Sequence, residues 1–320
     1  MKELLRTGDH VRISWLAALL AGESIETVVL DTHMSFAEGS ISAIPRRLMV
    51  ADEDYEAARR LLVEAGEWDG ADGDAADGDA ADRLLGGRIL LRQPAGGYRV
   101  AVDPVLLAAS VPAAATGRLL DAGTGVGAAA LCFADRVPGA QVAALELQPD
   151  LARLARGNVT LNGMDDRVSI VEGDILDPPP GLGSGAWDHV IANPPYLPAG
   201  RADPPPDAAK AAASVEGAAK LADWVGFALR MVKPKGGVTF IHRADRLDDL
   251  LSLLQGRAGG IVVFPLWPKA GREAKRVIVR ARPGVKTPLR IAPGLVLHEE
   301  DGGYTADALA ILRDGAALTL

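Results

Sequence analysis

The sequence predicts an α/β protein, in which a doubly wound, Rossmann-like sheet of seven strands with an antiparallel last hairpin follows a small N-terminal α+β domain. Strand and helix patterns alternate along residues 83–320, as they do where helices cover both faces of a parallel sheet. A glycine-rich turn follows the first strand of this series. Residues 1–82 hold 7 lysine and arginine residues against 18 acidic ones, a net charge of -11, whereas residues 83–320 have a net charge of +3.

The composition fits a soluble protein of about two domains, with 320 residues, a formal charge of -8 and 48 % hydrophobic residues. No apolar stretch is long enough to cross a bilayer and no signal peptide opens the chain, so we expect a cytoplasmic protein without a membrane partner. Cys132 lies in an apolar helical pattern and is expected in the core. No metal site is expected, because His10 and His33 lack partners at metal-ligand spacing, and we interpret His189 and His242 as packing or strand-end residues.

Residues 1–66 predict a βαββα domain, with strands over 2–7 and 26–31 around a helix from 9 to 20, and a further strand and helix in 46–66. This segment, including the stretch 33–54, resembles the small signal-transducing domains that are themselves similar to PII-like nitrogen-regulatory proteins. That resemblance implies a regulatory role, with a regulatory partner or ligand, and no defined chemistry.

An acidic linker is predicted over residues 67–82, where Gly-Asp-Ala-Ala-Asp repeats and few apolar groups offset the entropy of ordering. The aspartates raise the alternative of a calcium site. The spacing of an EF-hand loop with its closing glutamate is absent, which favours a solvated linker.

The main sheet is expected in residues 83–320, and ligands of such sheets bind at the carboxyl ends of the strands. Its strands are predicted over residues 118–123, 141–147, 167–174, 187–195, 236–243, 260–267 and 275–283. Its helices are predicted over residues 126–137, 149–163, 215–231 and 246–256.

A cofactor turn is predicted at Gly123, Gly125 and Gly127, with Thr124 among them, because glycines allow a tight turn and close ligand approach at a helix N-terminus. The same pattern fits the fingerprint of dinucleotide-binding proteins. Asp121 favours S-adenosylmethionine over NAD, because a carboxylate there repels a pyrophosphate but accepts a hydrogen bond from the ammonium of a methionine moiety.

Two further acids follow the next strands. Glu146 ends the second strand, where a carboxylate can accept both ribose hydroxyls, although NAD enzymes use an acid in the same way. Asp174 follows the third strand and can accept the adenine amine, with a helix cap or a solvated acid as the alternative for each. Leu147 and Ile175, their neighbours, are included among the candidate cofactor-binding residues.

The catalytic candidates are Asn193, Pro194, Pro195 and Tyr196, after the fourth strand. Prolines end a strand, and the side-chain carbonyl of Asn193 and the backbone carbonyl of Pro194 can accept the two N–H groups of a planar amine. Such a pair directs the amine lone pair at a sulfonium methyl, while Tyr196 stacks on the ring. Positioning and electrostatics then suffice for catalysis, without a metal.

With these motifs, residues 84–308 resemble the bacterial tRNA adenine N6-methyltransferases that modify an adenosine beside the anticodon of a valine tRNA. The Asn-Pro-Pro-Tyr motif is shared with DNA adenine and protein glutamine methyltransferases, whereas the first and last matching stretches narrow the family. The resemblance implies S-adenosylmethionine-dependent N6-methylation, with Tyr98, Arg99 and Asp103 near the cofactor and the catalytic mouth. The stretches that match are 96–111, 119–127, 144–175, 190–200, 236–247 and 292–305.

The substrate side of the sequence is less defined. Relatives have an Arg-His-Glu cluster where this chain has residues 213–216, Ala-Ser-Val-Glu, so the exact RNA stays open. Eight cations within 22 residues suit a phosphate backbone, or line the solvated face of the last hairpin. They are Lys269, Arg272, Lys275, Arg276, Arg280, Arg282, Lys286 and Arg290.

We therefore expect tRNA or another structured RNA as the substrate. One alternative is a protein glutamine N5-methyltransferase of the release-factor type, which also presents a planar amide to such a loop. A second alternative is a regulatory binding protein whose methyltransferase half is gated by S-adenosylmethionine.

Overall fold

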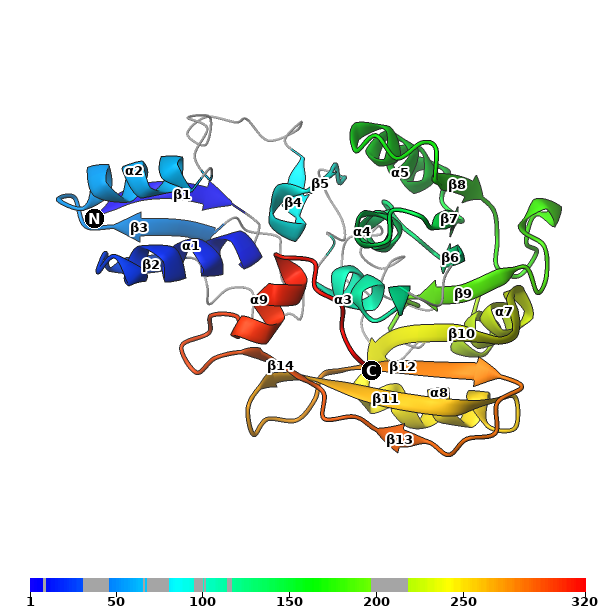
Figure 1. Cartoon of the computed structure of the whole chain (residues 1–320). Coiled ribbons are helices and arrows are strands. Elements are labelled where there is room, and N and C mark those ends of the chain that lie inside the picture. Colours follow the sequence, from blue (N-terminus) through cyan, green and yellow to red (C-terminus); the bar gives the residue numbers. More distant parts are fainter. Residues whose placement is uncertain are drawn as a thin grey trace.

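The computed structural model describes residues 1–7, 10–30, 46–65, 67, 81–94, 100, 102–113, 117–196 and 218–320 (Figure 1). Most of the expected linker, His33, Tyr98, Arg99 and residues 213–216 lie outside the described residues. None of the helices in these ranges combines the length and the apolar character that a membrane span requires.

The N-terminal elements follow the predicted βαββα order. They are β1 (Lys2–Thr7), α1 (His10–Gly22), β2 (Thr27–Leu30), β3 (Arg46–Val50) and α2 (Tyr55–Glu64). Strand β3 lies between β1 and β2 and is antiparallel to both. The two helices pack on this sheet around a core that includes Leu16, Leu48 and Leu62, none of which is exposed.

The main sheet contains the predicted doubly wound arrangement, in the order β13-β11-β12-β10-β9-β6-β7-β8, with β14 paired to β11. Strands β6 to β10 are parallel, and β12 is antiparallel to both of its neighbours, β10 and β11. The seven predicted strands are β6 (Arg118–Ala122), β7 (Gln141–Glu146), β8 (Val168–Glu172), β9 (Trp187–Ala192), β10 (Val232–Arg243), β11 (Ala258–Lys269) and β12 (Arg276–Pro283).

Two short strands that the sequence did not predict extend this sheet, β13 (Arg290–Ile291) and β14 (Leu295–His298). Both are parallel to β11. Strand β13 is exposed and only two residues long, so it has no hydrophobic alternation from which it could be predicted. A separate hairpin of β4 (Asp82–Leu84) and β5 (Ile89–Leu91) precedes the sheet.

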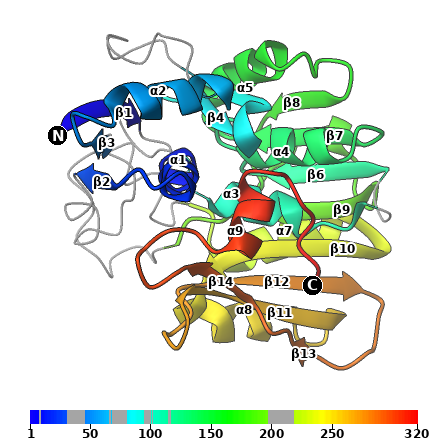
Figure 2. The same ribbon diagram turned by 60° about the vertical axis from the view of Figure 1, so that its left-hand side comes forward.

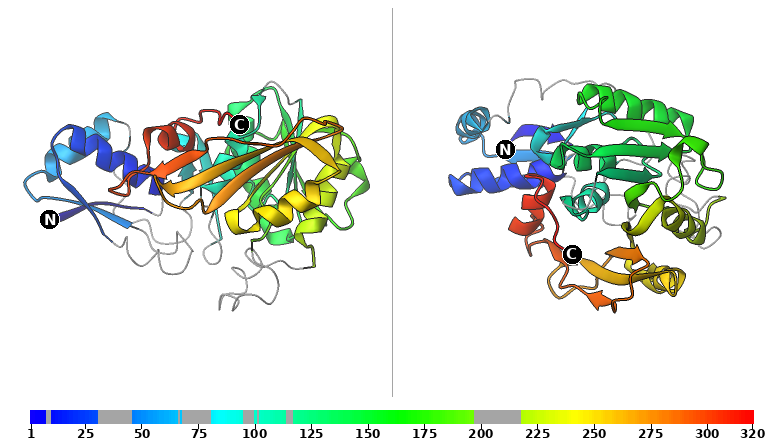
Figure 3. Two further views of the ribbon diagram at one scale, coloured as in Figure 1. Left: turned by 90° about the horizontal axis from the view of Figure 1, so that it is seen from below. Right: turned by 45° about the vertical axis from the view of Figure 1, so that its right-hand side comes forward.

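Helices cover both faces of the main sheet, and this explains why its strands are continuous apolar runs. Successive residues of a strand enter opposite cores, so that Leu119 packs on one side and Leu120 on the other. Figure 3 shows α8 and α9 on opposite faces of the strands. The first face carries α3 (Asp103–Ala109), α4 (Ala128–Arg136), α5 (Pro149–Leu161) and α9 (Ala306–Leu312), and the second α7 (Leu221–Met231) and α8 (Leu247–Leu254).

The N-terminal elements contact the main body through α1, which lies beside α9 (Figure 2). The Tyr304 N–H donates to Ser14 Oγ at 2.9 Å, and the Arg313 guanidinium lies 3.6 Å from the centre of the Trp15 ring. Val11 packs against the main core. Figure 1 shows these elements on the side of the main sheet toward which β9 points, which is its carboxyl edge.

Candidate active site

The register of the sheet brings the predicted site residues to one edge. Ala122, the last residue of β6, pairs with Leu145 on β7 and with Ala192 on β9. Gly123, Glu146 and Asn193 each follow one of these paired residues, so they lie on the same carboxyl edge. Sequence reasoning anticipated this clustering, because the ends of parallel strands meet.

The glycine turn is as tight as its sequence predicts. Gly123, Gly125 and Gly127 have φ values of 70°, 60° and 92°, a region that side chains disfavour. A Cβ atom on Gly123 would also lie only 2.5 Å from the Trp224 ring. The N–H groups of Gly123 and Thr124 donate to the Leu145 carbonyl at 2.8 and 3.0 Å, which fixes the turn against β7.

Asp121 is a buried carboxyl group beneath this turn, with 2 % of its surface exposed. It accepts a hydrogen bond from the Thr124 hydroxyl at 2.5 Å. Burial, together with the nearby Glu146 carboxylate, raises the pKa of Asp121 to about 7. A cationic partner stabilises the ionised form of such a buried acid, so Asp121 suits an ammonium group and not a pyrophosphate.

Glu146 holds two parts of the site together. Its Oε2 accepts the Gly125 N–H at 2.8 Å and its Oε1 accepts the Gln148 N–H at 2.9 Å, next to the start of α5. Burial raises the pKa of this carboxyl group. Each carboxylate oxygen has a second lone pair, so Glu146 retains the capacity to accept hydroxyl groups while it positions the turn.

Glu146, the last residue of β7, lies beside the end of β8, since it pairs with Glu172 and its backbone carbonyl accepts the Gly173 N–H at 2.9 Å. Asp174 Oδ1 accepts the N–H of Leu176 at 2.9 Å, which orders the following turn. Beside these acids, Leu147 is 60 % exposed, whereas Ile175 is buried.

The catalytic candidates form a compact cluster with Asp103, the first residue of α3. The Tyr196 hydroxyl lies 2.6 Å from Asp103 Oδ2 and 2.7 Å from Asn193 Oδ1. A hydroxyl has one proton, so Tyr196 donates to only one of these oxygens at a time. Asp103 is buried to 8 % exposure, which places the acid that the resemblance indicated directly beside the Asn193 motif.

Arg276 belongs to this cluster, although sequence analysis grouped it with the eight cations of residues 269–290, the basic run. Its Nε donates to Asp103 Oδ2 at 3.2 Å, and its guanidinium lies 4.5 Å from the centre of the Tyr196 ring. Although burial opposes it, the charge of Asp103 together with Tyr196 raises the pKa of Arg276 above its usual value. The position of Arg276 could have been predicted from topology, because an antiparallel β12 must start at the carboxyl edge, where Arg276 pairs with Arg243.

His242 was interpreted as a packing or strand-end residue, and it lies at the end of β10 in contact with Tyr196, a catalytic candidate. Its ring meets the Tyr196 ring edge-on, with 5.4 Å between centres and 77° between planes. The side chain is fully buried, and neither ring nitrogen has a hydrogen-bond partner of normal geometry among the described residues. Burial lowers its pKa to about 4, so this imidazole is neutral at pH 7.

Cys132 lies in the core, as the sequence predicts. Burial raises the pKa of Cys132 to about 12, and its buried position in α4 confirms that it is a core residue. Within the described ranges, no group of three or more histidine, cysteine or acidic side chains could hold a metal ion.

The chain matches two protein families. Residues 1–66 match the family described as "Putative prokaryotic signal transducing protein", and residues 100–207 match "Methyltransferase small domain".

Among curated proteins, the tRNA1(Val) (adenine(37)-N6)-methyltransferase of Aeromonas hydrophila is 30% identical over 210 residues, which is 65% of this chain and 85% of that protein. The enzyme of the same name from Porphyromonas gingivalis is 31% identical over 230 residues, 67% of this chain and 87% of the relative. The release factor glutamine methyltransferase of Deinococcus radiodurans is 47% identical over only 81 residues, 27% of its length.

Among solved structures, that of a "predicted O-methyltransferase" from Agrobacterium tumefaciens superposes with a TM-score of 0.57 at 25% identity. The match covers 68% of this chain and 99% of that one.

Proposed function

The chain belongs to the tRNA1(Val) (adenine(37)-N6)-methyltransferase family, and on that premise we propose that it methylates N6 of an adenine next to the anticodon of a tRNA. The family also decides the cofactor, because its members are S-adenosylmethionine-dependent methyltransferases; NAD is not the ligand of the glycine turn. The observation that carries the proposal is the position of Asn193, Pro194 and Tyr196 on the same edge as that turn.

We assign the cofactor site to the residues around the glycine turn. When it is bound, S-adenosylmethionine supplies an activated sulfonium methyl group. Asp121 accepts the cofactor ammonium, Glu146 the ribose hydroxyls and Asp174 the adenine amine. The remaining members of the proposed site are Gly123, Thr124, Gly125, Gly127, Leu147, Ile175, Asp103, Asn193 and Tyr98.

The target amine is bound by the acceptor pair of Asn193 Oδ1 and the Pro194 carbonyl, and Tyr196 stacks on the base. The Tyr196 hydroxyl competes for Asn193 Oδ1, which lies 2.7 Å away. Donation to Asp103, at 2.6 Å, leaves Asn193 Oδ1 open to the amine. Arg276 supports this state, because its ion pair with Asp103 Oδ2 holds the acceptor of the Tyr196 hydroxyl in place.

The division of the chain follows from this assignment. We propose that residues 83–320 form the methyltransferase domain, that residues 1–66 form a domain with a regulatory partner or ligand, and that residues 67–82 link the two.

The experiment is transfer of radiolabelled methyl from S-adenosylmethionine to total RNA and to total protein in parallel, with mass spectrometry of the labelled product. We expect N6-methyladenosine in the tRNA fraction. Label on protein glutamine would instead establish the release-factor activity, which is supported only by the partial match of the Deinococcus enzyme. Tight cofactor binding without label in either fraction would identify a regulatory binding protein and overturn the enzymatic proposal.

A further inference from the structure

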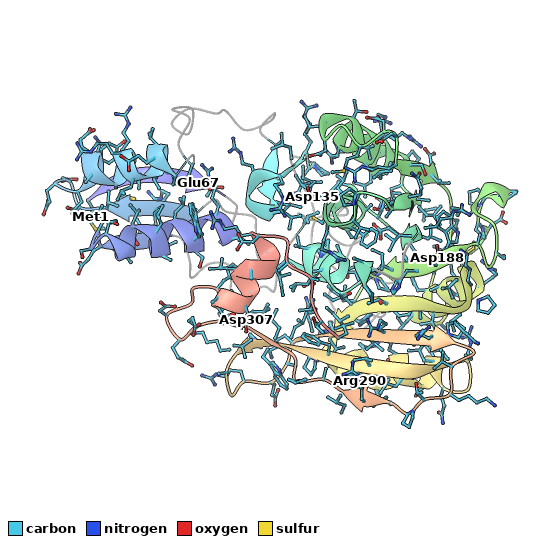
Figure 4. The ribbon with its side chains drawn as sticks, in the orientation of Figure 1. Met1, Glu67, Asp135, Asp188, Arg290 and Asp307 are labelled. Atoms are coloured by element: carbon cyan, nitrogen blue, oxygen red, sulfur yellow. The ribbon has the colours of Figure 1, made fainter. Side chains whose placement is uncertain are left out.

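A hollow of about 760 Å³ lies at the edge of the main sheet opposite the candidate active site. It is bounded by the amino ends of β9 and β10, the carboxyl end of β12 and the segment that leads into β13. Figure 4 labels two of its lining residues, Asp188 and Arg290. Along β12, Arg276 at the active site and Arg282 at the hollow are six residues apart, which is about 20 Å in a strand.

The lining of this hollow carries an excess of positive charge. Five cationic side chains line it: Lys233, Lys235, Arg280, Arg282 and Arg290. Its one carboxylate, Asp188, is already engaged, because it pairs with Lys233 at 2.5 Å and accepts the Arg118 N–H at 2.9 Å. Within the described part of the chain, the other four cations form no ion pair with a carboxylate side chain.

Two neighbouring arginines act on Arg280. Burial and the charges of Arg290 and Arg282 lower the pKa of Arg280. Arg280 Nη2 makes a long hydrogen bond of 3.5 Å to the backbone oxygen of Leu320, the last residue of the sequence. His189, also in the lining, adds no charge, because burial lowers its pKa to about 3. An anion in the hollow would relieve this repulsion.

Lys235 is held in a strained conformation in the first part of β10, where the pairing with β9 is irregular between Val232 and Gly237. Lys235 has a φ of 64°, which side chains other than glycine rarely adopt. Arg282 donates to the Lys235 carbonyl from Nε at 3.0 Å and from Nη2 at 2.8 Å. A Cβ on the next residue, Gly236, would lie 2.7 Å from the Asp188 carbonyl oxygen, so this part of β10 is also packed tightly against β9. Strain of this kind persists where the surroundings fix it, and it gathers at functional sites.

We propose that this hollow is a second binding site, specific for phosphate groups. Guanidinium groups match phosphate oxygens in geometry as well as charge, and lysine adds a point charge. The phosphate is supplied either by a free polyphosphate or nucleotide, or by the backbone of an RNA that extends about 20 Å beyond the active site. The site is independent of the reaction proposed above, since none of its residues belongs to the catalytic cluster.

The test variant is Lys235→Gln/Arg290→Gln in the full chain. Both side chains are exposed, and the substitutions leave the bonds from Arg282 to the Lys235 carbonyl intact. The matched control is Arg60→Gln/Arg153→Gln, which removes two exposed cations from α2 and α5, away from the hollow.

In the first arm, inorganic tripolyphosphate and ATP are titrated while the Tm is followed, since a ligand of the folded state raises Tm with concentration. We expect a saturable rise in the wild type and the control, and a Kd weakened by about tenfold or more in the test variant. In the second arm, tRNA binding is measured against salt concentration. Loss of two backbone contacts would flatten the slope by about 0.7–0.9 per contact in the test variant only.

A response in the first arm alone assigns the site to a free polyphosphate or nucleotide, and a response in the second assigns it to RNA. The proposal is overturned if the test variant and the control behave alike in both arms. Unchanged binding of S-adenosylhomocysteine in all variants verifies that the fold is intact, and this readout does not depend on methylation activity.

Discussion

Cofactor affinity should depend on pH through Asp121. The pKa of this buried carboxyl group is raised to about 7, so below pH 7 it is protonated in the unliganded protein. Its proton must leave before the carboxylate can pair with the cofactor ammonium, so affinity falls as the pH falls. With a pKa of about 7, the ionised fraction is about one half at pH 7.0 and about 3 % at pH 5.5, which predicts a Kd about 15-fold weaker at pH 5.5.

The assay is isothermal titration of S-adenosylhomocysteine across this pH range, where its ammonium stays protonated. Two controls isolate Asp121. 5′-Methylthioadenosine lacks the amino-acid moiety and should bind with little pH dependence, and Asp121→Asn should bind S-adenosylhomocysteine weakly with a flat profile. A wild-type Kd that stays within twofold between pH 5.5 and 7.0 would refute the assignment of Asp121 to the ammonium.

Three further predictions concern the catalytic cluster and the N-terminal domain. Asn193→Ala should lose about 100- to 1000-fold of the methylation rate with a much smaller loss of cofactor affinity, and a rate within threefold of wild type would contradict the proposed mechanism. Arg276→Gln should lower kcat by about 10- to 100-fold at unchanged cofactor Kd, with Arg272→Gln on the adjacent exposed turn as the control. Equal effects of the two substitutions would show that Arg276 has no role beyond that of the other cations in the basic run. A chain that starts at Arg83 should fold and bind S-adenosylmethionine like the full chain, with equal or higher tRNA affinity at low salt; a folded but inactive product, on an RNA that the full chain methylates, would contradict this.

The clustering of the predicted site residues was accessible from sequence because it follows from topology alone. Asp121, Glu146 and Asn193 each mark the end of a parallel strand, and parallel ends share an edge. Asp103 came from resemblance instead, since it lies at the start of α3 and no strand pattern points to it.

The features of the site that could not be predicted from the sequence depend on strand register and on packing between turns. The basic run appears continuous along the chain, but β12 carries its members from one edge of the sheet to the other. Arg276 therefore meets Asp103, 173 residues away, whereas Arg282 reaches the opposite hollow. Likewise, no local pattern reveals that both oxygens of Glu146 accept backbone N–H groups, because those bonds depend on how the turns after β6 and β7 pack together.

The contact between α1 and α9 changes what the N-terminal charge can do. Charges on a freely moving domain act through an average separation, and salt screens them beyond about 10 Å at 0.1 M. The structure instead holds α1 against α9 and the residues that flank it, through Ser14 and Trp15, beside the carboxyl edge of the main sheet. The described residues among 1–82 hold 10 acidic against 7 basic side chains, and at that edge their excess negative charge opposes an approaching RNA at short range, where screening is weakest. Release of this contact by a partner or ligand of the first domain would therefore raise RNA affinity without any change in the cofactor site.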